Sequence, residues 1–136
     1  MTDAAQGEPS NHEVFTKPFK VEPVFEEWNT PQSYRRGPEG AKLPDKLKVW
    51  RVQNTSPQPA TRSNPASAIS RPLGPSHLPK AEVLTPGFNT SNRNGAAGAA
   101  RDGNFLQWGF SAPPSKMTDA GRNFFLNCVC YIAKVK

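Results

Sequence analysis

Residues 101–136 read RDGNFLQWGFSAPPSKMTDAGRNFFLNCVCYIAKVK, and this stretch decides the fold. Its Asp102-Gly103 pair is typical of a two-residue type I′ hairpin turn, because both central residues of that turn need positive φ. Residues 95–101, just before the turn, are almost all Ala and Gly. These are poor strand formers, but small residues suit a strand that a helix covers closely. We therefore expect a hairpin whose first strand is small and packed.

The second strand of this hairpin is predicted from alternation over residues 105–110. Leu106, Trp108 and Phe110 share one side of the strand, and Phe105 lies on the other. In a strand, successive side chains point to opposite faces of the sheet. The shared face is large and wholly apolar, so we expect it to be buried against a helix.

One apolar helix follows the hairpin. Thr118 is its expected N-cap, and Asp119 is well placed in the first turn for the helix dipole. The predicted buried side holds Phe124, Cys128, Ile132 and Val135, widened by Phe125, Val129 and Tyr131. The predicted solvent side holds Arg122, Asn123, Asn127 and Lys134. Because the apolar run is shorter than the roughly 20 residues that span a bilayer, we predict a core helix and no membrane insertion.

Composition bounds the rest of the chain. Its 136 residues hold 15 Pro and 10 Gly, and only 35% are apolar, so a core that covers the whole chain is not expected. We predict a flexible tail over residues 1–11 and one incomplete α/β domain over 12–136, with a long Pro- and Ser-rich loop at 54–79. The expected fold class is α/β: a small mixed sheet with a C-terminal core helix and long Pro-rich loops.

The N-terminal half carries weaker structural signals. The pattern predicts an extended segment along a sheet edge at residues 19–25, a short turn at 26–28 and a helical turn that begins with Pro31 at 30–34. It also predicts strands at 48–52 and 81–84 and a second turn at 85–87. Val49 is expected on the opposite face of its strand from Trp50. Residues 1–10 lack the apolar segment of a secretory signal, and the sequence leaves the compartment open.

The charge pattern argues against a nucleic-acid partner. The chain has a net charge of +6 and a pI near 9.6, but its basic residues are scattered, and Arg35-Arg36 is the one adjacent basic pair. A nucleic-acid footprint normally gathers basic residues into a stripe or patch. Scattered basic residues are more typical of an ordinary soluble surface.

No group of residues predicts catalysis, a metal site or a cofactor site. Cys128 and Cys130 lie about 200° apart on a helix, so they form neither a metal pair nor a disulfide, and we interpret both as small core residues. His12 beside Glu13, and His77 in the Pro-rich loop, are interpreted as structural or solvent-facing, because no nucleophile motif accompanies them.

The remaining polar motifs have plain structural interpretations. Asp102 is expected in a turn and Asp119 in a helix first turn. The run 95–100 lacks the context of a phosphate loop. Asn54-Thr55-Ser56 and Asn89-Thr90-Ser91 match the glycosylation sequon, which matters only in a secretory context that the sequence does not indicate.

Two segments resemble a known family. The C-terminal pattern resembles the closing unit of ThuA-like and class I glutamine-amidotransferase-like domains, at Arg101, Gly103, Asn104, Trp108, Gly109, Phe110, Phe125, Asn127, Tyr131 and Ile132. Residues 11–15 with Pro18-Phe19 are similar to the entry into the second half of those domains, with Glu13 where the family has Pro. The resemblance is to uncharacterised bacterial variants found in exported proteins. It implies that the half with the nucleophilic Cys would precede residue 1.

The resulting functional hypothesis is a non-catalytic structural or interaction module derived from an amidotransferase-like fold. The alternative is the C-terminal half of a hydrolase-like or carbohydrate-related enzyme. We expect possible self-association or a protein partner, because half of a doubly wound fold would leave one sheet face incompletely covered. Phe105 and the Ala-rich strand are the predicted exposed residues of that face.

Overall fold

The computed structural model describes residues 4–6, 11–36, 38, 40–54, 81–88 and 96–134. Within these ranges, six strands form one sheet, and helix α1 (Asp119–Ala133) packs on it. The strands lie in the order β2 (Phe25–Asn29), β3 (Lys46–Arg51), β1 (Ala4–Gln6), β4 (Glu82–Gly87), β5 (Ala96–Asp102) and β6 (Phe105–Trp108). Each pairing of these neighbours is antiparallel. The predicted α/β class, with a C-terminal core helix, is confirmed.

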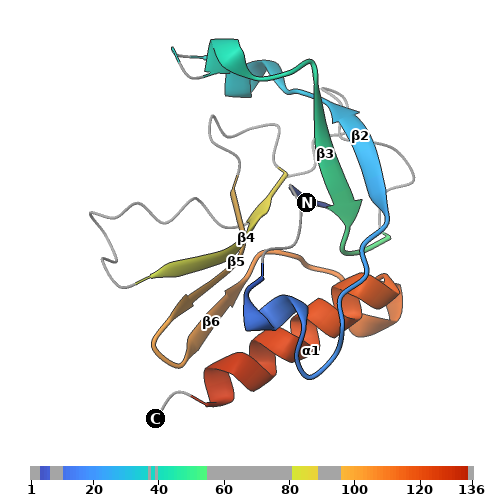
Figure 1. The fold of residues 1–136 in the computed structure, drawn as a ribbon, viewed down its shortest axis with the longest axis vertical. Helices are drawn as coiled ribbons and strands as arrows, with labels where there is room; N and C mark the ends of the chain where they lie inside the picture. The colour runs from blue at the N-terminus through green and yellow to red at the C-terminus, as the bar shows by residue number, and fades with distance from the viewer. Residues whose placement is uncertain are drawn as a thin grey trace.

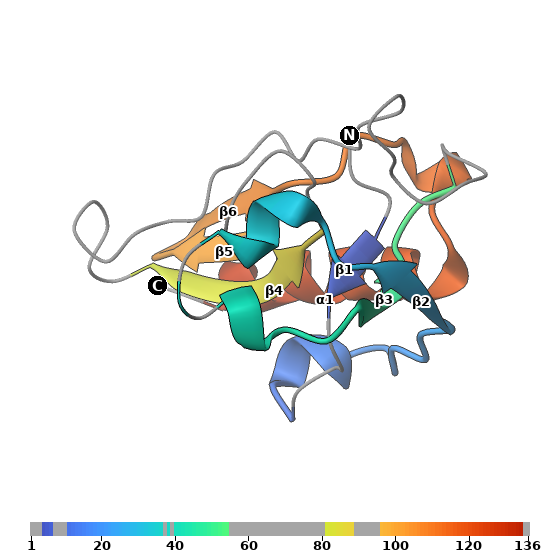
Figure 2. The same ribbon diagram turned by 90° about the horizontal axis from the view of Figure 1, so that it is seen from above.

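The helix crosses one end of the molecule. Figure 1 shows α1 along the lower border, with the short helix η1 (Glu13–Phe15) in front of it. The short helices η2 (Gln32–Arg35) and η3 (Gly40–Lys42) lie at the opposite end. Seen from above, α1 runs behind the strands (Figure 2). Among the described residues, no helix is both long and apolar enough to cross a membrane.

The N-terminus of α1 is fixed to the end of β3. Thr118 is the N-cap, as predicted, and its Oγ1 accepts a hydrogen bond from the Gly121 amide at 3.0 Å. The Thr118 amide donates to the Val52 carbonyl oxygen at 3.0 Å. A Cβ atom on Gly121 would lie 1.9 Å from that same oxygen. The close approach of helix and strand therefore requires glycine at this position.

The β5–β6 hairpin forms one residue later than predicted. Asp102 pairs with Phe105, so Gly103 and Asn104 are the two central residues of the turn. Gly103 has φ of 57°, and no other described residue of the turn has positive φ. Glycine with positive φ at the first central position is the type II′ pattern, so the predicted type I′ turn at Asp102-Gly103 is wrong. Glycine takes the strained position, and Asp102 ends the strand.

The main core lies between the sheet and α1. The predicted face of β6 is confirmed: the Trp108 ring lies 5.7 Å from the Phe124 ring and 5.0 Å from the Phe125 ring, measured between centroids. Phe110 is buried, whereas Phe105 on the other side of the strand is 69% exposed. The Phe124 ring also contacts Trp50 on β3. Phe124, in the middle of α1, therefore packs on strands from both halves of the sheet, β6 and β3.

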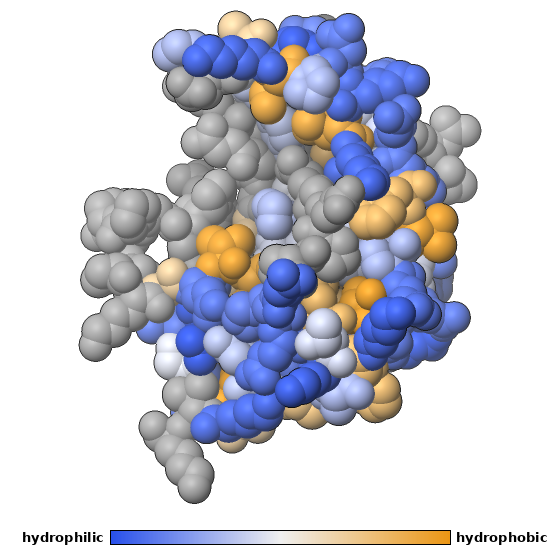
Figure 3. Space-filling model, viewed as in Figure 1, coloured by the Kyte–Doolittle hydropathy of each residue, from blue (hydrophilic) through white to orange (hydrophobic). Residues whose placement is uncertain are grey.

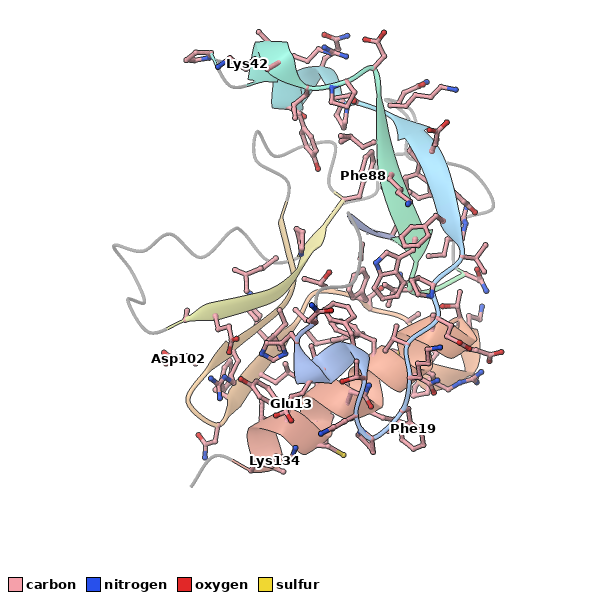
Figure 4. The ribbon with its side chains drawn as sticks, in the orientation of Figure 1. Glu13, Phe19, Lys42, Phe88, Asp102 and Lys134 are labelled. Atoms are coloured by element: carbon pink, nitrogen blue, oxygen red, sulfur yellow. The ribbon has the colours of Figure 1, made fainter. Side chains whose placement is uncertain are left out.

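A second apolar cluster lies on the other face of the sheet. It contains Trp28, Val49 and Phe88 around Ala4, with the Trp28 and Phe88 rings edge to face at 5.1 Å. Figure 4 labels Phe88. Val49 and Trp50 lie in different clusters, so the predicted alternation along this strand is confirmed.

Strand β1 corrects the predicted tail. Residues 4–6 lie inside the sheet between β3 and β4, and Ala4 and Ala5 are fully buried. Their small side chains allow the strand to lie under both apolar clusters. A three-residue strand of Ala, Ala and Gln has no alternation that the sequence could reveal.

Two predicted turns are strands. Residues 26–28 belong to β2, an edge strand, and Trp28 is 3% exposed because it packs on the second cluster. Residues 85–87 continue β4, with register shifts between Val83 and Thr85 and between Thr85 and Pro86. Such irregularities accommodate a proline, which has no amide hydrogen for the ladder. Residues 55–79 of the predicted loop lie outside the described residues.

Candidate interaction surface

A carboxylate on β4 joins four elements of the fold. Glu82 Oε2 accepts hydrogen bonds from Arg101 Nε at 3.1 Å and from the Tyr131 hydroxyl at 3.1 Å, and it lies 3.0 Å from Arg101 Nη2. Glu82 Oε1 lies 3.0 Å from His12 Nε2. The cluster therefore ties the residue that caps η1 to β4, β5 and α1. Burial raises the pKa of Tyr131, and the hydrogen bond to Glu82 raises it further, so the phenol remains a donor at neutral pH.

His12 contacts the protein through both ring nitrogens. Its Nδ1 accepts a hydrogen bond from the Val14 amide at 3.3 Å, while Nε2 faces Glu82. Glu13 points instead to Lys134 Nζ at 3.1 Å, and Figure 4 shows these two residues side by side. His77 lies outside the described residues.

Residues 12–21, which we call the strap, cross α1 and are held there by Asn127. Asn127 Nδ2 donates to the carbonyl oxygens of Val14 at 2.9 Å and Phe19 at 2.6 Å. Asn127 Oδ1 accepts from the Phe19 amide at 2.9 Å. Asn127 is fully buried, so its predicted place on the solvent side is wrong. The helix periodicity puts it at the border of the core, and the strap covers that border.

The two cysteines differ in environment. Cys128 is fully buried, and burial raises its pKa to about 12, so its thiol is protonated at physiological pH. Cys130 is exposed. The prediction that both are core residues is therefore correct for Cys128 and wrong for Cys130. The turn of about 200° between them places one on each side of the helix.

A groove of about 490 Å³ lies at the N-terminal end of α1. It is lined by Lys20, Glu22, Val24, Glu26, Arg51, Thr118, Asp119, Ala120 and Asn123. Its charged side chains pair within the chain: Lys20 with Glu22 at 2.9 Å, Arg51 with Glu26 at 3.0 Å, and Asp119 with Arg122. Because each of these charges has a partner within the chain, the groove has no strong preference for a charged ligand.

Helix α1 presents a row of apolar and small residues to solvent. We call this row the outer face: Leu126, Val129, Cys130 and Ala133, all exposed, with Leu126 and Val129 each 41% exposed. The spacing i, i+3, i+4 and i+7 places the four on one side of the helix. Val129 was predicted to widen the buried side, and this is wrong. Because both sides of α1 are apolar, hydropathy could not show which side faces the sheet.

The strap also exposes an aromatic side chain. Phe19 is 46% exposed, and its backbone is bound by Asn127, next to Leu126 in the chain. Figure 4 shows the Phe19 side chain below the strap, directed away from the sheet. The front of the molecule, by contrast, shows mostly hydrophilic residues with small separate hydrophobic patches (Figure 3). The outer face differs from these patches because its four exposed residues follow one side of a helix.

The sheet face directed away from α1 exposes fewer residues than predicted. Phe105 is 69% exposed and Val83 is 48% exposed. Ala97, Ala99 and Ala100 of the Ala-rich strand are buried, which contradicts their predicted exposure. This sheet face, which was predicted to bind a partner, therefore exposes only some of the predicted residues. The most regular row of exposed apolar residues lies on α1 instead.

Comparison of the chain with protein-family models, with curated proteins and with solved structures gave no match. The antiparallel sheet gives no support to the amidotransferase-like resemblance, because doubly wound folds have mostly parallel sheets. Within the described ranges, no three His, Cys, Asp or Glu side chains are grouped so that they could hold a metal ion.

The sequence held one signal for the strap. Asn127 interrupts the apolar run FFLNCVCYIA, and a polar residue within such a run marks either a solvent-facing position or a buried anchor with partners. The prediction chose the first. The second would have pointed to a segment elsewhere in the chain with backbone groups to bind.

Proposed function

We propose that the chain is a non-catalytic interaction module that binds a protein partner through the outer face of α1. The observation that carries this proposal is the exposed row Leu126, Val129, Cys130 and Ala133 on a helix whose other side is buried in the core. Apolar residues at i, i+3, i+4 and i+7 are the anchors by which helices dock in grooves or on one another.

The helix is held rigidly before any partner binds. Thr118 caps its first turn, Phe124 is fully buried, and Asn127 binds the strap to its middle. A surface that is already ordered loses little conformational entropy on binding. Complete burial of an aliphatic side chain stabilises by about 1.5–3 kcal/mol, so Leu126 and Val129, each roughly half exposed, together offer about that amount.

The polar clusters support a role other than catalysis. Both ring nitrogens of His12 contact the protein, and the thiol of Cys128 is buried with a raised pKa. Cys130 is exposed and lies among the apolar residues of the outer face. The alternative of a hydrolase-like half would need its nucleophile and base from residues outside this chain, and it stays a prediction.

The test is affinity capture, with the parent chain and two variants each immobilised and compared. Leu126→Glu combined with Val129→Glu places two charges on the outer face, whereas Val24→Glu is a matched control at an 81% exposed site elsewhere. We expect proteins captured by the parent to be retained by the Val24 variant and lost by the outer-face variant. Equal capture by all three, with unchanged melting temperatures, would contradict the proposal.

A further inference from the structure

We propose that the open edge of β6 binds an extended segment of another protein, which adds to the sheet as a further strand antiparallel to β6. β6 is the last strand in the order of the sheet, so one of its sides has no neighbouring strand among the described residues. This inference goes beyond the proposed function, because it concerns a different surface and does not require the outer face to be occupied.

The register of the hairpin shows which backbone groups the edge offers. The Gly109 amide donates to the Gly98 carbonyl oxygen at 2.8 Å. In an antiparallel pair, hydrogen-bonded residue pairs alternate with pairs that are not bonded. Gln107 and Phe105 therefore bond to β5, and the amide and carbonyl groups of Leu106 and Trp108 point away from it. No described residue is a hydrogen-bond partner of these four outward groups.

Unlike the other edge strand, β6 lacks the features that protect an edge. Natural edge strands commonly carry charged residues or proline, which oppose pairing with another chain. β2 carries Glu26 and Glu27, whereas β6 reads Phe-Leu-Gln-Trp, with no charged residue and no proline. β6 is therefore the edge that is chemically open to a further strand.

The flank of α1 beside β6 supplies an apolar contact for the added strand. The Phe125 ring lies 5.0 Å from the Trp108 ring and Phe125 remains partly exposed. Ile132, also partly exposed, lies seven residues later and so on the same side of α1. In an antiparallel pair, a residue that hydrogen-bonds to Leu106 or Trp108 carries its side chain on the same face as that residue. Side chains at two alternate positions of the added strand would therefore face α1.

The partner that fits this edge is an extended segment with apolar residues at two alternate positions. Neither position is proline, because each must donate an amide hydrogen to β6. The net charge of +6 favours a neutral or acidic segment, and it opposes the pairing of two β6 edges from two copies of the chain.

A synthetic peptide and two methylated forms of it test the hydrogen bonds directly. The probe is acetyl-Thr-Val-Glu-Val-Thr-amide, whose two Val residues can pair with Leu106 and Trp108. One form carries methyl groups on the amide nitrogens of both Val residues, which face β6 in the antiparallel arrangement. The matched control carries them on Glu and the last Thr, whose amides face away. NMR of the full chain follows the amide signals and the hydrogen exchange of Leu106 and Trp108.

We expect the unmethylated peptide and the matched control to bind alike and to slow the exchange of the Leu106 and Trp108 amides. Methylation of both Val residues removes two hydrogen bonds, so it should weaken binding by about tenfold or more. The Leu126→Glu variant should bind the peptide as the parent does, because the outer face is not involved.

Two results would overturn the inference. If methylation of Glu and Thr abolished binding while methylation of the Val residues did not, the antiparallel arrangement would be wrong, because a parallel strand turns the other set of amides toward β6. Equal binding of all three peptides, or no change at Leu106 and Trp108 with millimolar peptide, would show that β6 does not accept a strand. Either result leaves the proposed function of the outer face as it stands.

Discussion

The replacement Asn127→Ala should release the strap from α1. It removes three hydrogen bonds and leaves the Val14 carbonyl, the Phe19 carbonyl and the Phe19 amide without their partner. The bond to Val14 is buried, and loss of a buried partner costs about 1–3 kcal/mol. The two bonds to Phe19 are partly accessible to water, so each contributes about 0.5–1.5 kcal/mol. The expected loss in the free energy of unfolding is therefore about 2–6 kcal/mol.

The assay is urea unfolding of the parent, of Asn127→Ala and of Asn123→Ala. Asn123 lies one turn earlier and makes one exposed hydrogen bond to the same strap, to the Lys20 carbonyl at 3.1 Å, so its loss should cost less than about 0.5 kcal/mol. Hydrogen exchange at the Val21 amide, which donates to Phe15 within the strap, should accelerate in the Asn127 variant alone. Equal stability of the two variants would refute the account of the strap.

Three further predictions concern single side chains. Trp108→Ala should lower the free energy of unfolding by about 3–5 kcal/mol through lost ring contacts. Trp108→Phe should lower it by less than about 1.5 kcal/mol, because the buried Nε1 has no hydrogen-bond partner among the described residues. Equal losses for the two variants in thermal unfolding would contradict this. A maleimide at neutral pH should label Cys130 quickly and Cys128 only on unfolding, because Cys128 is buried and burial raises its pKa to about 12. One rapid thiol in a Cys130→Ser variant would show that α1 is not held on the core. Glu82→Gln should lower stability by about 1 kcal/mol, a value reduced by solvent screening at a site one-third exposed, since Arg101 loses its ionic partner; an unchanged urea midpoint would show that the cluster does not tie the elements together.

The sequence predicted the C-terminal hairpin and helix because strong local signals agree there. The alternation around Trp108, the Thr118 cap and the apolar run after it each favour one structure, and the packing of Trp108 on Phe124 follows from them. Strand β1 could not be predicted, because Ala4–Gln6 has neither length nor alternation, and its burial depends on two strands from distant parts of the chain.

The candidate surface could be predicted only in part. Hydropathy identified α1 as apolar, but it could not decide that Val129 faces solvent while Asn127 is buried. That choice depends on the strap, whose Phe19 and Val14 lie more than one hundred residues earlier in the chain. A helix that is apolar on both sides has two possible orientations, and the hydrogen bonds of one asparagine select between them.

The most direct test of the outer face as a binding surface is the alkylation rate of Cys130 with and without a protein that the immobilised parent captures. Cys130 lies in the middle of the outer face and is exposed in the single chain. If the captured protein covers this face, its addition should slow the alkylation of Cys130 in the parent and leave the rate unchanged in the Leu126→Glu variant. A parent rate that the bound protein does not change would contradict the proposed function.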